Sequence, residues 1–214
     1  LFYRFAGYCE PVAALGKSDL KQVPVEKTRI FDFTEASVRT EPGRGGALEL
    51  ARRAAQAGVT VCFCLNYRPA AWPSPSDAIR IYREALGYAG LAVMNVEEAC
   101  LVSRAADPAK AALAIAGLGP KWVAVTNGEQ GGWVCAEEKV WPFAAFPVDF
   151  AYDVGAGDTF HAGLLDAYLD GREAVAACRW AAAAVHLKLR QGDPNFFASR
   201  EQVEEFLAAG GAER

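Results

Sequence analysis

The chain has 214 residues, of which 52% are hydrophobic and 22% are charged, and this composition predicts one sizeable folded domain rather than disorder. Its net charge of −4 argues against nucleic-acid binding, which depends largely on clustered Lys and Arg side chains. No stretch approaches the roughly 20 apolar residues of a membrane-spanning helix. The six cysteines do not cluster, which predicts reduced thiols. We therefore expect a cytoplasmic protein with a small-molecule partner and no nucleic-acid or membrane partner.

Two hydrophobic periodicities alternate along the chain as far as Thr126. Apolar runs predict strands at 29–33, 59–65, 91–95 and 121–126. Apolar residues three or four positions apart predict helices at 41–58, 76–90, 96–102 and 108–119. Ser76 is the predicted N-cap of the second of these helices. This alternation predicts crossover units, and hence the α/β class with a doubly wound, mostly parallel sheet that carries helices on both faces.

The pattern changes after Thr126. The segments GGWVC and KVWPF, separated by AEE, predict a β-hairpin. Helices are then predicted at 156–170, 172–190 and 199–208, the last opened by a capping pattern from Ser199 to Gln202. The Ala-rich stretch RWAAAAVHLK predicts a tightly packed helix, and the only histidines, His161 and His186, are expected to pack rather than catalyse.

The segment VGAGDTFHAG places three small residues, Gly155, Ala156 and Gly157, before Asp158 at the start of a predicted helix. The first amides of a helix lack partners within the helix, and the positive end of the helix dipole lies there. Small residues let a phosphate oxygen approach these amides closely. The segment therefore predicts an anion site. The alternative is that Asp158 is simply an acid of the first turn that interacts with the dipole.

Other stretches carry polar residues at or near predicted strand ends, and each also has a purely structural interpretation. NVEE contains Asn95 and Glu98, which would also form a capping box. TNGEQGG contains Thr126, Gly128 and Gly131, and would also serve as a turn between strands. LNYRPAAWPS contains Asn66, Arg68 and Trp72, and Arg68 would also be an ordinary surface cation. We expect ligands to gather at strand ends of this kind in doubly wound sheets.

Taken together and in this order, the four stretches resemble the ribokinase-like, PfkB-type carbohydrate kinases, and in particular the branch of 2-keto-3-deoxygluconate kinases and fructokinases. Gly155 to Asp158 match the Gly-Ala-Gly-Asp core of the family signature. The chain departs from the family pattern at Tyr152, where an acid is usual, and at Asp153, where Thr or Pro is usual. It also has Cys64 where that branch usually has Asp, and alanines in AAAA where many members have an Asn beside adenine.

The resemblance implies a kinase with ATP and Mg²⁺ as cofactors. Asp158 would be the catalytic base that takes a proton from a sugar hydroxyl, and the amides of Gly155, Ala156 and Gly157 would stabilise the transferring phosphoryl group. Glu98 and Asn95 would hold Mg²⁺ through water. The residues that the resemblance assigns to cofactor binding are Asn66, Asn95, Thr126, Gly128 and Gly131.

The resemblance also implies a substrate class. The opening LFYR is similar to a lid strand that touches a sugar acid. Arg4 and Arg68 would therefore bind the carboxylate of a substrate such as 2-keto-3-deoxygluconate, and Asp158 would be the third substrate residue. A neutral sugar such as fructose is the alternative, and a non-catalytic sugar- or nucleotide-binding relative is another. We expect one α/β kinase domain over 1–214, incomplete at its N-terminus, with 1–12 as a remnant of a β lid that would support a homodimer.

Overall fold

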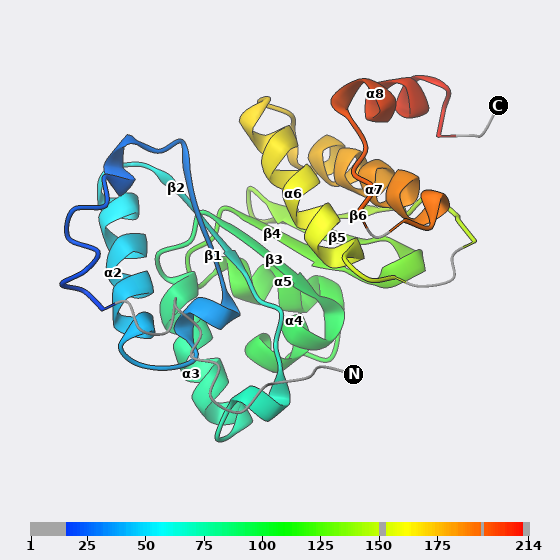
Figure 1. Ribbon diagram of the computed structural model, residues 1–214. Helices are drawn as coiled ribbons and strands as arrows, with labels where there is room; N and C mark the ends of the chain where they lie inside the picture. The colour runs from blue at the N-terminus through cyan, green and yellow to red at the C-terminus, as the bar shows by residue number, and fades with distance from the viewer. Residues whose placement is uncertain (1–15, 150–152, 194, 212–214) are drawn as a thin grey trace. The chain divides into compact units, whose positions relative to one another are not determined.

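Six strands form one mixed sheet in the order β1-β2-β3-β4-β5-β6, which confirms the predicted α/β class. The computed structural model describes residues 16–149, 153–193 and 195–211 (Figure 1). The chain forms two compact units: the first contains the chain up to Ala92 with Gly117–Pro120, and the second contains Val93–Ala116 and the chain from Lys121 onward. The single domain over 1–214 stays a prediction, and the lid remnant at 1–12 lies outside the described residues.

The first unit contains parallel strands joined by a helix. Its elements are η1 (Val25–Lys27), β1 (Ile30–Thr34), η2 (Glu35–Val38), α2 (Gly43–Gln56), β2 (Thr60–Cys64), η3 (Pro69–Ala71) and α3 (Pro75–Leu86), and β3 (Leu91–Asn95) begins in it. β1 pairs with β2 in parallel, with Phe33 opposite Phe63 and their ring centroids 4.8 Å apart. α2 connects the two strands and packs against both, so the predicted crossover unit is confirmed.

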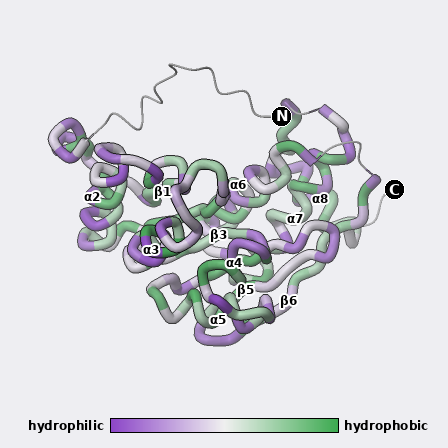
Figure 2. The backbone as a smooth tube through the Cα atoms, turned by 90° about the horizontal axis from the view of Figure 1, so that it is seen from below, coloured by the Kyte–Doolittle hydropathy of each residue, from purple (hydrophilic) through white to green (hydrophobic). Residues whose placement is uncertain are grey.

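Helix α3 shows why one prediction was wrong by two residues. Its N-cap is Ser74, whose Oγ accepts a hydrogen bond from the amide of Asp77 at 3.2 Å, and not Ser76. Pro75 takes the first helical position, where a missing N–H costs nothing. Figure 2 shows hydrophilic and hydrophobic residues alternating along α3. Its apolar side, which includes Ile81 and Tyr82, is buried, as the helical spacing predicts.

The second unit combines an antiparallel part of the sheet with five helices. Its elements are α4 (Val96–Ser103), α5 (Pro108–Ala116), β4 (Trp122–Thr126), η4 (Gly128–Gln130), β5 (Gly132–Ala136), β6 (Lys139–Phe143), α6 (Ala156–Leu169), α7 (Ala174–Gln191) and α8 (Arg200–Ala208). β5 pairs antiparallel with both β4 and β6, so the predicted hairpin is confirmed. Four of the five residues of β5 are buried, because α5 and α7 both pack against this strand. Figure 1 shows α5 and α7 on opposite sides of it.

Small residues let α6 and α7 approach each other closely. A Cβ built on Gly163 of α6 would lie 3.0 Å from the Cα of Ala181 on α7. Ala177, Ala181 and Ala183 are fully buried, so the Ala-rich stretch is the tightly packed helix that its composition predicts. This packing fixes the direction of α6, and with it the position of the helix's first turn.

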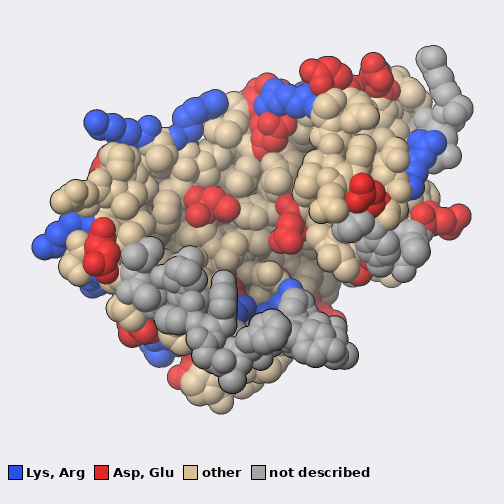
Figure 3. All heavy atoms as spheres, in the orientation of Figure 1, with Lys and Arg blue, Asp and Glu red and all other residues tan. Residues whose placement is uncertain are grey.

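The surface of the second unit is charged over α8. Figure 3 shows acidic and basic side chains side by side over α8. Arg200 of α8 contacts Asp166 at 2.6 Å and Asp170 at 3.3 Å, and the predicted capping box of Ser199 and Gln202 is present. Across the described ranges, no helix combines the length and the apolar character that crossing a membrane requires.

The described cysteines carry thiols rather than disulfides. Burial raises the pKa of the Cys178 thiol far above its ordinary range, and it also raises the pKa of Cys135. Both thiols therefore stay protonated and unreactive. The described cysteines therefore agree with the prediction of reduced thiols.

Candidate functional site

The turn before α6 is shaped by Gly155. This residue is the N-cap of the helix and has a φ of 79°, in the left-handed region that favours glycine. A Cβ at this position would also lie 3.3 Å from Cε of Lys188. The amide of Ala156 donates to the carbonyl of Asp153 at 3.0 Å, and the amide of Thr159 donates to the carbonyl of Gly155 at 2.9 Å. The GAG sequence therefore begins the helix with a tight turn that a larger residue at 155 would strain.

Gly157 and Asp158 occupy the open side of this first turn. A Cβ built on Gly157 would meet no atom within 4 Å, so the space beside its backbone is empty. The Asp158 side chain is exposed on the same turn. A carboxylate here interacts favourably with the helix dipole, as the structural alternative requires, and its exposure leaves it accessible to a second molecule.

The loop after β4 forms the second part of the site. Thr126 ends β4, and its hydroxyl donates to the carbonyl of Met94 in the adjoining strand at 3.4 Å. The amide of Asn127 donates to the carbonyl of Gly131 at 2.7 Å, which closes the loop around η4. Gly131 has a φ of 83°, and a Cβ there would lie 2.1 Å from the carbonyl oxygen of Phe143. Gly131 is thus required by the fold, whereas a Cβ at Gly128 would point into open space.

One cavity of about 790 Å³ unites these two elements within the second unit. Its wall includes Ala156 and Gly157 from the α6 turn, and Thr126, Gly128 and Gly131 from the loop after β4. The rest of the lining includes an apolar wall made of Phe143, Ala145, Phe146, Pro147, Val148, Phe160, Ala182, Val185 and Leu189, and the acidic residues Glu129, Asp149 and Asp153. Asp158, the residue after Gly157, is not part of the described cavity wall.

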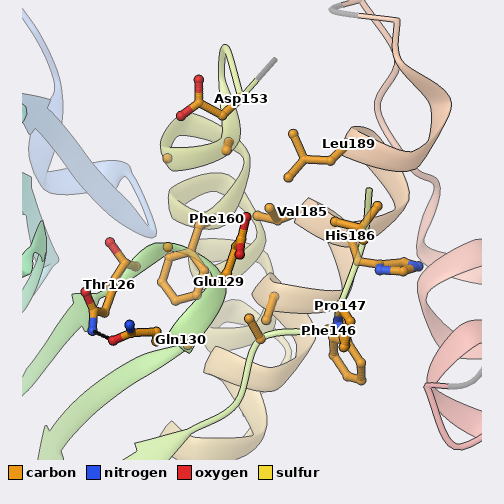
Figure 4. Close-up of a pocket in the computed structure, with 18 of the residues that line it drawn as sticks. Thr126, Glu129, Gln130, Phe146, Pro147, Asp153, Phe160, Val185, His186 and Leu189 are labelled. Atoms are coloured by element: carbon orange, nitrogen blue, oxygen red, sulfur yellow. Dashed lines mark hydrogen bonds between the residues drawn. The ribbon is translucent and has the colours of Figure 1, made fainter. Parts of the chain in front are cut away.

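Figure 4 shows how the side chains of this cavity lie. Phe160 stands between Thr126 and Val185, while the ring of His186 turns away from them toward α8. That ring stacks on Phe206 of α8, with the centroids 4.5 Å apart, and is 3% exposed. His186 therefore contributes packing at the cavity's edge, in agreement with its expected role.

Asn95 and Glu98 form the capping box that the sequence allows as their structural interpretation. The side-chain Oδ1 of Asn95 accepts from the amide of Glu98, and Oε2 of Glu98 accepts from the amide of Asn95, both at 2.9 Å. Glu98 is 7% exposed. Asn95 ends β3 and Thr126 ends the neighbouring β4, so both lie where these two strands end.

Among the residues that the structure describes, the predicted substrate residues Arg68 and Asp158 do not line this cavity. Arg4 lies outside the described residues. Asn66 and Arg68 are exposed residues of the first unit, between β2 and η3, and Asn66 has a φ of 77°. Trp72 of the same stretch is buried, and its indole N–H donates to Oε1 of Glu35 at 2.6 Å.

The sequence alone does not reveal the apolar wall or the buried cation beside the α6 turn. The aromatic and proline residues of FAAFPV, directly after the hairpin, are the only signal for the wall, and they also suit an ordinary core segment. Lys188 lies on an amphipathic helix, where a lysine normally predicts solvent exposure, yet it is 3% exposed. Both features depend on contacts between segments far apart in the chain.

Comparison with known proteins identifies the family. The model of the pfkB family carbohydrate kinases matches residues 11–199, so the chain belongs to this family. Fructokinase-2 of Zea mays is 30% identical over 167 residues, which are 75% of this chain and 49% of the maize protein. The 2-dehydro-3-deoxygluconokinase of Bacillus subtilis is 28% identical over 155 residues, or 72% of this chain and 48% of that protein.

The fold is also that of solved kinases. The crystal structure of a fructokinase with bound ATP from Xylella fastidiosa has a TM-score of 0.80 and 20% sequence identity, over 94% of this chain and 67% of that chain. The predicted resemblance and the ribokinase-like fold are therefore confirmed. The chain spans about half the length of the curated relatives it matches.

Proposed function

We propose that this protein transfers the γ-phosphoryl group of ATP to a hydroxyl of a sugar or sugar acid. The observation that carries the proposal is that residues of the α6 turn and of the glycine loop after β4 line one cavity, next to an exposed acid. Its volume of about 790 Å³ falls within the roughly 300–1,000 Å³ of small-molecule sites. A nucleotide requires an apolar surface for its base and amides for its phosphates, and this cavity offers both.

The nucleotide would place its base against the apolar wall and its phosphates toward the α6 turn. Ala182 of the AAAA stretch is part of that wall, which supports base binding by packing where other members have an Asn. Thr126, Gly128 and Gly131 would contact the nucleotide from the loop side. Phosphoryl transfer depends mainly on such positioning and on electrostatic stabilisation.

Asp158 would accept the proton of the attacking hydroxyl as the oxygen bonds to the γ-phosphorus. A base must reach its substrate, and the exposed position of Asp158 on the first turn of α6 satisfies this. The amide of Gly157, beside the open space, would donate to the transferring group. The Ala156 amide already donates to Asp153, so its participation requires that the turn rearranges.

Mg²⁺ is a cofactor that the family implies, and the chemistry of Glu98 and Asn95 fits it. Both offer oxygen atoms, which Mg²⁺ prefers, and Mg²⁺ keeps part of its hydration shell. The capping box occupies Oε2 of Glu98, and an ionised carboxylate has further acceptor sites on its two oxygens. These residues would hold the ion through water, and the bound ion would supply positive charge near the phosphates.

The substrate class is argued from two arginines and from the relatives. Arg68 is an exposed cation of the first unit, and with Arg4 it favours a carboxylated sugar such as 2-keto-3-deoxygluconate. A neutral sugar is the alternative, because relatives of similar identity include both a fructokinase and a 2-dehydro-3-deoxygluconokinase. A non-catalytic binding relative is the alternative of another class, and the retained Asp158 favours an enzyme over it.

The test compares wild type with Asp158→Asn on ATP and a panel that includes fructose and 2-keto-3-deoxygluconate. We expect sugar-dependent ADP release, and a decrease of about 10²–10⁴-fold in the variant, because a general base contributes about that much. The free energy of unfolding should fall by no more than about 1 kcal/mol, since the side chain is exposed and loses only its interaction with the helix dipole. ADP binding without turnover on any sugar would support the non-catalytic relative. Turnover that Asp158→Asn leaves unchanged would refute the assigned base.

A further inference from the structure

Lys188 is a buried lysine that the proposed mechanism does not use. It lies near the end of α7 and is 3% exposed. An ammonium group loses much hydration energy on burial, so it is rarely buried without compensating contacts. The contacts of Lys188 show what its charge is placed beside.

Two groups after α7 fix the ammonium. Its Nζ donates to the carbonyl of Phe196 at 3.2 Å, and it lies 4.5 Å from the centroid of the Phe197 ring. A carbonyl acceptor and the face of an aromatic ring both stabilise a cation. The side chain is therefore anchored at its charged end.

The same side chain lies against the first turn of α6. A Cβ built on Gly155 would be 3.3 Å from Cε and 3.9 Å from Nζ of Lys188. The ammonium thus lies beside Gly155, the N-cap of the helix that carries the proposed phosphate site, although Lys188 itself does not line the cavity. A positive charge there adds to the field of the helix N-terminus, and in a site of low dielectric constant this attraction is weakened little by solvent.

We propose that Lys188 is a built-in cation of the phosphate-binding turn, a positioning residue that holds the Gly155 turn and strengthens its attraction for the nucleotide's phosphates. The proposal deepens the proposed function and rests on it. On this proposal the buried charge of Lys188 serves anion binding and not only the stability of the fold. The purely structural alternative is that Lys188 only ties α7 to the segment after it.

The experiment uses Lys188→Ala, Lys188→Met and the control Lys110→Met, which removes an exposed lysine of α5. ADP affinity is measured by calorimetry, and kcat and sugar KM by turnover. Each measurement is made in ammonium or methylammonium chloride and in choline chloride at equal ionic strength. Thermal unfolding shows which variants are folded.

We expect ADP affinity and kcat to fall roughly tenfold or more in both Lys188 variants, with little change in sugar KM, because removing one preorganised charge-stabilising group commonly costs this much. Ammonium or methylammonium should restore part of the loss in Lys188→Ala, because the truncated side chain leaves space for the ion. The rescue should be smaller in Lys188→Met, where the methionine side chain fills that space. The Lys110→Met control should match wild type. A merely structural lysine would give no such ion-specific rescue.

The opposite results overturn the proposal. ADP affinity within about twofold of wild type in folded Lys188→Met would show that the charge does not act on the phosphates. Loss of the fold in both Lys188 variants, or a loss of affinity that no small cation restores, would assign the residue to structure alone. If wild type binds ADP but phosphorylates no sugar, the kinase proposal fails while the ADP comparison still decides the role of Lys188. If wild type does not bind ADP, both proposals fail.

Discussion

Asp158 and Glu35 are two carboxylates that the chain places in opposite surroundings. Asp158 is exposed on the first turn of α6, beside a glycine with open space around it. Glu35 is fully buried in the first unit and accepts hydrogen bonds from Arg39, at 2.7 Å to Oε2, and from the indole of Trp72. A base must change its partners during a reaction, whereas a structural acid must keep them.

The segments that carry the two acids also differ in how firmly hydrogen bonds hold them. Arg44 donates to the carbonyls of Val38 and Arg39, so the segment that carries Glu35 is held from both its side chains and its backbone. The α6 turn instead presents small residues toward a cavity. Saturated hydrogen bonding and open space are therefore the features that distinguish a structural acid from a candidate catalytic one in this protein.

The largest effect is expected for Glu35→Ala. The substitution leaves the guanidinium of Arg39 and the indole N–H of Trp72 without their shared acceptor in a buried site. Breaking a buried pair on one side typically costs about 3–5 kcal/mol, and we expect the free energy of unfolding to fall by about that amount in a urea titration. The control Glu49→Ala removes a partly exposed pair with Arg52 and should cost far less, because solvent-exposed ion pairs contribute little to stability. Equal losses in the two variants would contradict the special role of Glu35.

The sequence predicted the helices and strands well because their signals are local. Hydrophobic spacing placed the strand at 91–95 correctly, and the glycine and capping patterns placed the starts of α6 and α8. The error at α3 was also local: in the stretch PSPSD, Ser74 precedes the proline that opens the helix, and that order marks the earlier serine as the cap.

The site was predictable only where it is made of backbone. Glycines at 128, 131, 155 and 157 signal loops and close approach from the sequence alone, and the structure brings these loops to one cavity. The apolar wall, the contact of Lys188 with the Gly155 turn and the contact of Glu35 with Trp72 join residues far apart in the chain. Side-chain type and local spacing do not encode such contacts, so the sequence could not reveal them.

Gly131→Ala is expected to have the next largest effect. The residue has a positive φ, and a Cβ would lie 2.1 Å from the backbone carbonyl of Phe143, which cannot move without disturbing β6. We expect a loss of about 2 kcal/mol or more in the free energy of unfolding, measured by urea titration. Gly128→Ala is the matched control in the same loop: its φ of 54° is also positive, but a Cβ there meets no atom within 4 Å. It should cost only about 1 kcal/mol, and a larger loss than for Gly131→Ala would contradict the close-contact argument.

Of these three substitutions, Gly157→Ala should have the smallest effect on stability, but it should weaken ADP binding. A Cβ at this position meets no atom within 4 Å, and alanine in a helix is favoured over glycine by roughly 0.5–1 kcal/mol, so the variant should be as stable as wild type or slightly more stable.

The same methyl group would enter the space that we assign to the phosphates, because Gly157 lines the cavity. We expect ADP affinity, measured by calorimetry, to fall roughly tenfold, which corresponds to about 1.4 kcal/mol. Gly90→Ala, whose added Cβ would make only ordinary contacts at 3.8 Å, is the control and should bind ADP as wild type does. Unchanged ADP affinity in Gly157→Ala would show that phosphates do not approach the α6 turn, and the carboxylate of Asp158 would then lose its proposed substrate.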